Sequence, residues 1–421
     1  MSGRHGQAEL PGCELGRDDT GHWPVLVTDG EQRAALAVVR ALGAAGYPVY
    51  VCSDRRRSLA GASRYARREE AVPSPLAEPA RFVSAVSRLM QRWQIKLLLP
   101  VADPSLLALL PWRESFDGVV IPFPDVETYR RVSDKSLVLD TAAALGLATP
   151  RQRVIASPEA GATLDVGMLT LPLVLKPARS IAETNGARVK LGVTYAASPE
   201  ELRSRLRALP PAAYPVLLQE RIVGLGIGIF LLRWGGSTAA VFAHRRLREK
   251  PPSGGVSVSR ESIAADPELV AQSEALLEHF GWEGVAMVEY KLEAATGTPY
   301  LMEVNGRFWG SLQLAVDAGV NFPVLLASAA TGRPHPVVPR YRTGVRSRWW
   351  WGDLDVVLSR LRRSSASLAL PPDAPTRWRM LLEFLKLWRP GEKNEVLRWR
   401  DPLPFVRETL EWFRGIGTAD P

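Results

Sequence analysis

The stretch Leu301–Gly310, LMEVNGRFWG, carries a polar side chain at every second position of an otherwise apolar run. Alternate side chains of a β-strand point to the same face, so Glu303, Asn305 and Arg307 would share one face. The apolar residues between them would occupy the other face. A carboxylate, an amide and a guanidinium gathered on one side of a strand indicate a binding site rather than a core strand.

A second carboxylate is expected opposite Glu303. The segment between Glu289 and Glu303 contains the turn sequence ATGT, and a hairpin centred near Thr296 would pair these two residues directly. Opposed like charges destabilise a sheet unless a cation compensates them. Asn305 adds a neutral oxygen on the same face. Two carboxylates and an amide oxygen suit Mg²⁺, or Mn²⁺ in its place. Glu289, Glu303 and Asn305 are therefore the predicted metal ligands, and a solvated hairpin face is the alternative.

Length and composition describe a globular chain. Its 421 residues predict two or three packed domains, and no stretch approaches the ~20 uncharged apolar residues that span a bilayer. Two cysteines, Cys13 and Cys52, are too few for a disulfide framework or a zinc site. The first two dozen residues lack the apolar core of a signal peptide. These features predict a cytoplasmic protein that begins with a flexible tail over residues 1–22.

Residues 23–132 are predicted to form an open α/β domain with a parallel sheet. A strand at 25–28, a helix from about 32 to 44 and a strand at 49–53 make a βαβ unit. Further alternation follows, and GVVIPFP at 118–124 is expected to be another strand.

Residues 133–332 are predicted to form an α+β domain, because strand-like runs joined by hairpins, among them ARVKLGVTYA at 187–196, alternate with helical segments. Residues 333–421 are rich in Trp, Arg and Pro and are expected to be mostly helical. In this last region the sequence TRWRMLLEFLKLW predicts an amphipathic helix. Packing on the preceding domain is its main expected role, and weak contact with a membrane surface is the alternative. Ser133 or Asp134 is expected to cap a helix that runs through Leu145 and ends at Gly146. The other helices expected in the two regions lie at 199–208, 267–280, 354–363, 376–388 and 404–413.

Glu289 and the sequence LMEVNGRFWGSLQLAVDAGVNFPVLL resemble the metal-binding signature of the ATP-grasp superfamily. The signature is a Glu on one strand and, a hairpin later, Glu-x-Asn-x-Arg before a helix. The pattern is most similar to members related to the large chain of carbamoyl-phosphate synthetase, and it covers Asp134 to about Gly332. The resemblance implies an α/β plus α+β chain: an ATP-grasp fold preceded by an open parallel α/β domain and followed by a mostly helical C-terminal region.

The resemblance also implies ATP-binding residues. Two lysines of the family reach the phosphates, and Lys135 and Lys176 occupy the matching positions, with an ordinary exposed lysine as the alternative at 135. The segment LLQERIVGLG resembles the hinge that contacts adenine and ribose. Lys291, on the face of Glu289, is a further candidate, although a surface lysine is equally compatible. The hinge candidates are Gln219, Glu220, Arg221 and Ile222.

Two loops depart from a simple match. Many relatives follow the second lysine with a glycine-rich loop, whereas this chain has KPARSIAETNGARVK, so Arg179 and Ser180 would supply donors or the loop would cover the nucleotide differently. The later sequence HRRLREKPPSGGVSVSRES is either a tight hairpin with solvated arginines or a loop beside the reacting acid. The second interpretation places Arg246, Arg248 and the Ser253–Gly255 turn beside the reacting acid or the transferred phosphate, and Arg248 joins Arg307 as an expected catalytic residue.

The implied chemistry is ATP-dependent activation of a carboxylate as an acylphosphate, followed by attack of an amine, or less often a thiol, with release of ADP and phosphate. ATP and Mg²⁺ are the expected cofactors, and a small carboxylate and an amine are the expected partners. Activation of bicarbonate or carbamate is the alternative within the family. A non-catalytic, ATP-binding protein at a membrane surface is the alternative outside it. Nucleic acid is not an expected partner, although RYRTGVRSRWWWGD is basic and aromatic. The sequence leaves the oligomeric state open.

Overall fold

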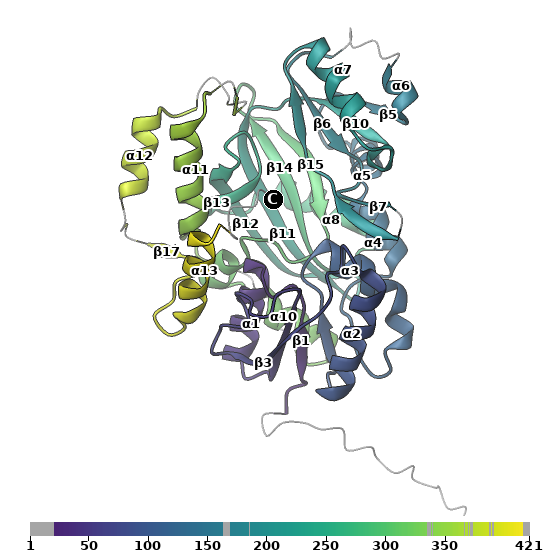
Figure 1. The fold of residues 1–421 in the computed structure, drawn as a ribbon, viewed down its shortest axis with the longest axis vertical. Helices are drawn as coiled ribbons and strands as arrows, with labels where there is room; N and C mark the ends of the chain where they lie inside the picture. Colours follow the sequence, from purple (N-terminus) through teal and green to yellow (C-terminus); the bar gives the residue numbers. More distant parts are fainter. Residues whose placement is uncertain are drawn as a thin grey trace, which may run out of the picture.

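The structure is a computed structural model, and it describes a chain whose helices and strands reach from β1 near the N-terminus to α13 near the C-terminus (Figure 1). The flexible tail predicted over residues 1–22 lies outside the described residues apart from Gly21 and His22. The end of the helix predicted at 376–388 also lies outside them. The described residues are 21–162, 169–184, 186–334, 338, 340–365, 367–368, 370, 374–386, 389 and 391–415.

The N-terminal part is built on a four-stranded sheet in the order β3-β2-β1-β4, with all neighbours parallel. The predicted open parallel α/β arrangement is therefore confirmed. The prediction of a strand in GVVIPFP is wrong, because this segment contributes only one isolated β-bridge, between Val120 and Leu97. Prolines at 122 and 124 cannot donate ladder hydrogen bonds, which explains why pairing stops. The elements are β1 (Val25–Val27), α1 (Arg33–Ala44), β2 (Val49–Ser53), β3 (Ala66–Ala71), α2 (Pro79–Arg92), β4 (Leu97–Leu99), α3 (Asp103–Leu109), η1 (Leu110–Ser115) and α4 (Val126–Ser133).

A small antiparallel sheet follows, in the order β5-β10-β6-β9. Helix α5 leads into it, and Asp134 caps that helix by accepting from the backbone N–H of Ser136 at 3.1 Å. The sequence ARVKLGVTYA, predicted as one strand, is divided between β8 and β9, and β7 and β8 form a separate hairpin. The elements are α5 (Lys135–Ala144), β5 (Gln152–Ile155), α6 (Pro158–Ala162), β6 (Leu173–Pro177), β7 (Ile181–Thr184), β8 (Ala187–Lys190), β9 (Thr194–Ala196), α7 (Pro199–Ala208), η2 (Pro211–Ala213) and β10 (Val216–Glu220).

A seven-stranded sheet in the order β15-β14-β11-β12-β13-β16-β17 runs through the middle of the molecule (Figure 1). Strand β13 is a difference from the prediction, since its sequence VSVSRES lies in the segment expected to be a hairpin or a loop beside the reacting acid. The described helices include no single one with the length and hydropathy to cross a membrane, and α9 and α10 meet those criteria only as a pair bent by 91°. The elements are β11 (Gly224–Trp234), β12 (Ser237–Lys250), β13 (Val256–Ser262), α8 (Pro267–His279), β14 (Gly284–Glu293), β15 (Pro299–Asn305), α9 (Leu312–Ala318), α10 (Phe322–Ala330), β16 (Arg346–Arg348) and β17 (Glu392–Asn394).

The C-terminal region forms α11 (Trp350–Arg362), α12 (Arg377–Leu385) and α13 (Leu403–Phe413), as expected for a mostly helical region. The three helices gather at the left of Figure 1, where Trp350 stacks on Phe384 and Trp351 on Trp412. This region is also tied to the rest of the fold by buried ion pairs. Arg40 of α1 pairs with Asp401 at 2.8 Å, and the fully buried Arg260 of β13 pairs with Glu395.

Candidate functional site

Strands β14 and β15 form the hairpin that the sequence predicted. Glu289 lies directly opposite Glu303, and Met287 lies opposite Asn305, with a register shift on the turn side of Glu289. The predicted pairing of the two carboxylates is therefore confirmed, and the sheet holds them side by side on one face. Their assignment as metal ligands stays a prediction.

Two lysines approach this face from different elements. The Lys135 ammonium lies 3.6 Å from the Glu303 carboxylate and donates to the Ser180 hydroxyl at 2.8 Å. Burial favours the protonated form of Glu303, but the charges of Lys135 and Lys176 outweigh it and hold its pKa below the ordinary value. Burial, reinforced by Lys135, lowers the pKa of Lys176 to about 8. Both predicted phosphate-binding lysines are thus electrostatically coupled to Glu303.

Arg246 reaches Glu289 from two strands away. Its Nη2 donates to Glu289 Oε2 at 2.5 Å, and its Nη1 donates to Glu249 Oε1 at 3.0 Å. Strand β11 lies between β12 and β14, so the side chain must cross it. It crosses at Gly226, where an added Cβ would lie 2.8 Å from Arg246 Cδ. Burial raises the pKa of Glu289 even with Arg246 beside it.

The sequence indicates Arg246 as a residue beside the reacting acid, but it does not predict that Arg246 crosses β11 to pair with Glu289. The signal that could have revealed it is the alternation of glycines in GLGIG at 224–228, which leaves one face of a central strand without side chains.

Arg248 does not lie on the face of Arg246, although the two residues are two positions apart in β12. The pairing of β12 with β13 shifts register on both sides of Arg248, so the alternation that would place it with Arg246 is broken. Its Nε and Nη2 each donate to a carboxylate oxygen of Asp353 at 2.7 Å. Asp353 lies in α11 and is fully buried. The catalytic role of Arg248 stays a prediction, and the structure gives its guanidinium an ion-pair partner in the C-terminal region.

Arg307 connects the hairpin to the N-terminal part. Its Nε donates to Asp103 Oδ2 at 2.7 Å, and its Nη2 donates to Asn305 Oδ1 at 3.1 Å. Asn305 in turn donates to Glu303 Oε1 at 3.1 Å. Although burial favours the neutral acid, the charge of Arg307 and a hydrogen bond from Tyr129 keep the pKa of Asp103 low. Arg307 is therefore fixed by oxygen atoms on two elements.

The hinge candidates are held mainly by other protein groups. Gln219 is buried and donates to Gln152 Oε1 at 2.7 Å, while Glu220 Oε1 accepts from the Thr170 N–H at 2.9 Å. Strand alternation puts Gln219 on the face of Lys176 and Glu220 on the opposite face. Arg221 lies over the Tyr195 ring, 5.0 Å from its centroid. The side chains of Gln219, Glu220 and Arg221 therefore have protein partners in this structure, and their role in nucleotide binding stays a prediction.

The two remaining candidates, Ile222 and Lys291, are partly exposed. Ile222 lies between β10 and β11, and Lys291 pairs with Gly226 of β11. Lys291 is close enough for its charge to contribute to lowering the pKa of Lys176. It therefore belongs to the same charged face as Glu289.

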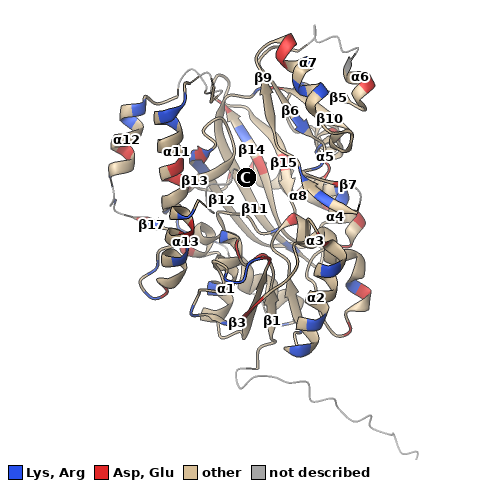
Figure 2. Ribbon diagram, in the orientation of Figure 1, with Lys and Arg blue, Asp and Glu red and all other residues tan. Residues whose placement is uncertain are grey.

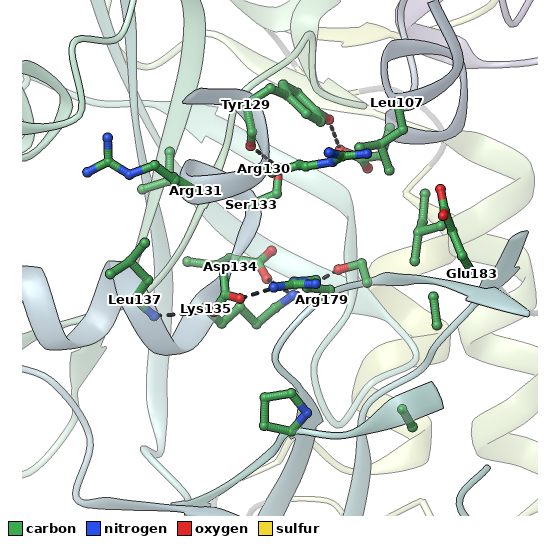
Figure 3. Close-up of a pocket in the computed structure, with 18 of the residues that line it drawn as sticks. Leu107, Tyr129, Arg130, Arg131, Ser133, Asp134, Lys135, Leu137, Arg179 and Glu183 are labelled. Carbon is green, nitrogen blue, oxygen red and sulfur yellow. Dashed lines mark hydrogen bonds and ion pairs between the residues drawn. The ribbon is translucent and has the colours of Figure 1, made fainter. Parts of the chain in front are cut away.

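A cavity of about 660 Å³ opens beside this face (Figure 3). Lys135, Glu303 and Asn305 line it, whereas the other predicted metal-binding, ATP-binding and catalytic residues are not part of its wall. The segment that replaces the glycine-rich loop also lines it through Arg179 and Ser180, and the Arg179 Nε lies 3.1 Å from Asp134 Oδ2. The supply of donors to a nucleotide by Arg179 and Ser180 stays a prediction.

The oxygens of this face suit a hard divalent cation. Glu289, Glu303 and Asn305 offer oxygen donors only, which is the set that Mg²⁺ prefers. The described part of the chain contains no cluster of three or more His, Cys, Asp or Glu side chains placed for a metal. A cation held here would therefore depend on the Asn305 amide and on oxygens from water or substrate.

The chain is similar to known proteins in sequence and in fold. Residues 213–351 match the family described as ATP-grasp in the biosynthetic pathway with Ter operon. A putative D-alanine–D-lactate ligase from Streptomyces coelicolor is 28% identical over 248 residues, covering 54% of this chain and 68% of the relative.

Two solved structures share the fold at low identity. An L-amino acid ligase from Bacillus licheniformis superimposes with a TM-score of 0.58 at 18% identity, covering 73% of this chain and 74% of the other. A biotin carboxylase from Campylobacter jejuni, solved as a complex with a β,γ-ATP compound, superimposes with a TM-score of 0.60 at 15% identity. The match covers 76% of this chain and 74% of the other.

Proposed function

This chain is a member of the ATP-grasp superfamily, and we propose that it is a ligase that activates a carboxylate with ATP for attack by an amine. A carboxylate oxygen of the acid attacks the γ-phosphorus, and ADP leaves. The amine nitrogen then attacks the acyl carbon, loses a proton and displaces phosphate. The observation that carries the proposal is the pairing of Glu289 with Glu303 on a face that Lys135 and Lys176 approach.

The protein residues would act mainly by charge placement. Lys135 and Lys176 would offset the phosphate charge, and Arg307, already held by Asp103 and Asn305, would stabilise the negative charge that develops during transfer. Glu289, Glu303 and Asn305 would hold Mg²⁺, which supplies charge neutralisation of the triphosphate. Because no protein nucleophile is needed in such a reaction, positioning and electrostatics carry the rate enhancement.

The identity of the acid and of the nucleophile is best sought by a screen. Phosphate release from ATP would be measured with pools of amino acids and other small carboxylates, with bicarbonate as a separate arm. The nucleophile pool would include hydroxy acids as well as amines, because the relative from Streptomyces coelicolor is named for D-lactate. Mass spectrometry of positive pools would identify the ligated product.

The carboxylate face is tested by Glu303→Gln. This variant keeps the size of the side chain but removes its charge, so we expect substrate-dependent phosphate release to fall at least ~100-fold. Glu293→Gln, on the same hairpin near its turn, is the matched control and should retain activity. Nucleotide binding measured by calorimetry should lose its dependence on Mg²⁺ in Glu303→Gln. Unchanged turnover and unchanged Mg²⁺ dependence in this variant would refute the assigned site.

A further inference from the structure

Helix α13 exposes a continuous apolar stripe. Leu403, Val406, Leu410 and Phe413 follow each other at helical spacing, and each has 47% to 72% of its surface exposed. Trp399, just before the helix, is 92% exposed. The opposite side of α13 packs inward. Contiguous apolar surface of this kind marks an interaction site in a folded protein.

Helix α12 repeats the pattern. Trp378, Leu382 and Leu385 lie at positions i, i+4 and i+7 and are 73%, 63% and 57% exposed. The other face of the same helix buries Met380 and Phe384 against α11. Each helix is therefore apolar on two sides: one side builds the fold, and the other is largely exposed, although the Phe413 ring also contacts that of Trp351, with 5.7 Å between the ring centroids.

Exposed arginines lie at the end of α11 and at the end of α13. Arg362 and Arg363 at the end of α11 line a cavity of about 700 Å³ together with Trp412 and Phe413 of α13. Both arginines are exposed, as is Arg414, next to Phe413. The cavity joins the basic end of α11 to the apolar end of α13, so positive charge and exposed aromatic surface lie together.

We propose that α12, α13 and the end of α11 form a docking surface for an anionic membrane. Exposed Trp, Leu and Phe side chains would enter the boundary between headgroups and acyl chains, while the arginines would contact lipid phosphates. A second copy of the chain is a poorer fit, since a symmetric contact would bring the same arginines of both copies together. The three helices lie across the large sheet from α4 and β7 beside the cavity near Glu303 (Figures 1 and 2). Docking would therefore leave that cavity accessible.

The test is vesicle co-sedimentation of the full chain. Vesicles of phosphatidylglycerol and phosphatidylcholine would be compared with vesicles of phosphatidylcholine alone, at low and high salt. We expect binding to the anionic vesicles only, weakened by salt because surface charge attraction is screened. The double variant Arg362→Ala/Arg363→Ala should bind roughly 25-fold more weakly, at about fivefold for each arginine. Leu410→Asp should weaken binding at least ~10-fold.

Matched variants separate docking from general surface effects. Trp399→Ala should weaken binding to the anionic vesicles, and Trp112→Ala, which removes an exposed Trp of the N-terminal part, is its control. Arg203→Ala/Arg207→Ala removes two exposed arginines of α7 and is the control for the arginine pair on α11. Both controls should bind vesicles as the parent chain does, and circular dichroism should show that all variants are folded.

Two results would overturn the proposal. One is equal binding to neutral and anionic vesicles or to neither. The other is a dimer, measured by light scattering, that Leu410→Asp dissociates while vesicle binding is absent. Ligase activity should be the same in all of these variants, so a failure of the proposed reaction would not be confused with a failure of docking.

Discussion

Replacement of Arg246 by Ala tests whether this arginine stabilises the opposed carboxylates of Glu289 and Glu303 in the folded protein. In the parent chain Arg246 holds Glu289 at 2.5 Å, and the two side chains are only 11% and 14% exposed. Removing one partner of a largely buried ion pair costs about 3–5 kcal/mol, and partial exposure reduces this to about 2–4 kcal/mol. We expect that loss in the free energy of unfolding, measured in urea without divalent cation.

Mg²⁺ should restore part of the stability of Arg246→Ala. With Arg246 gone, Glu289 and Glu303 oppose each other without Arg246 as a compensating cation, so a metal that binds the folded state stabilises it by mass action. At a concentration 100 times its dissociation constant the gain is about 2.7 kcal/mol. The parent chain should gain less, because Arg246 competes for Glu289.

The same variant should also respond to pH. Burial already raises the pKa of Glu289, and loss of Arg246 raises it further. A carboxyl group with a raised pKa favours the folded state when protonated, and this contribution is lost as the pH rises through the folded-state pKa. The stability difference between Arg246→Ala and the parent should therefore narrow on acidification.

Arg245→Ala is the matched control. Arg245 is the preceding residue, is 44% exposed and pairs with Glu261, and such a surface pair contributes about 0.2–1 kcal/mol. Equal losses of unfolding free energy in Arg245→Ala and Arg246→Ala, or equal stabilisation of both variants by Mg²⁺, would refute a specific role for Arg246 beside the two carboxylates.

Two further predictions concern Lys176 and Asp401. Because the pKa of Lys176 is lowered to about 8, its charge is lost as the pH rises through that value, and ATP affinity should fall about tenfold between pH 7 and pH 9. Calorimetry would check this, and a Lys176→Arg variant with the same pH dependence would exclude Lys176 as the cause. Asp401→Ala leaves the buried Arg40 unpaired and should cost about 3–5 kcal/mol in urea unfolding, whereas Glu78→Ala, which removes an exposed pair, should cost under about 1 kcal/mol. Equal losses in these two variants would contradict a structural role for Asp401.

The sequence predicted features that depend on local periodicity. The pairing of Glu289 with Glu303 follows from the turn position and a period of two, and the structure has this pairing. The helix after Asp134 follows from a capping residue, and the structure has it from Lys135 to Ala144. These predictions succeeded because the information lies within a few consecutive residues.

Features that depend on irregular or distant pairing were not predicted. A register shift separates Arg246 from Arg248, and no residue type marks its position. The crossing of Arg246 over Gly226 requires knowledge of which strand lies between β12 and β14. The pairing of Arg260 with Glu395 joins parts of the chain that local patterns treat separately. Strand order and long-range ion pairs are decided by tertiary packing.

The buried pair between Arg40 and Asp401 also has a consequence for synthesis. The two residues are 361 positions apart, so the ribosome adds Arg40 long before its partner exists. Domains generally fold in order of synthesis from the N-terminus, yet the outer face of α1 cannot neutralise its guanidinium until the segment around Asp401 has emerged. The parallel sheet can assemble early, but its interface with the C-terminal region must form late. In a chain stalled in translation before Asp401, the side of α1 that carries Arg40 would therefore be exposed, with its positive charge, to chaperones and proteases.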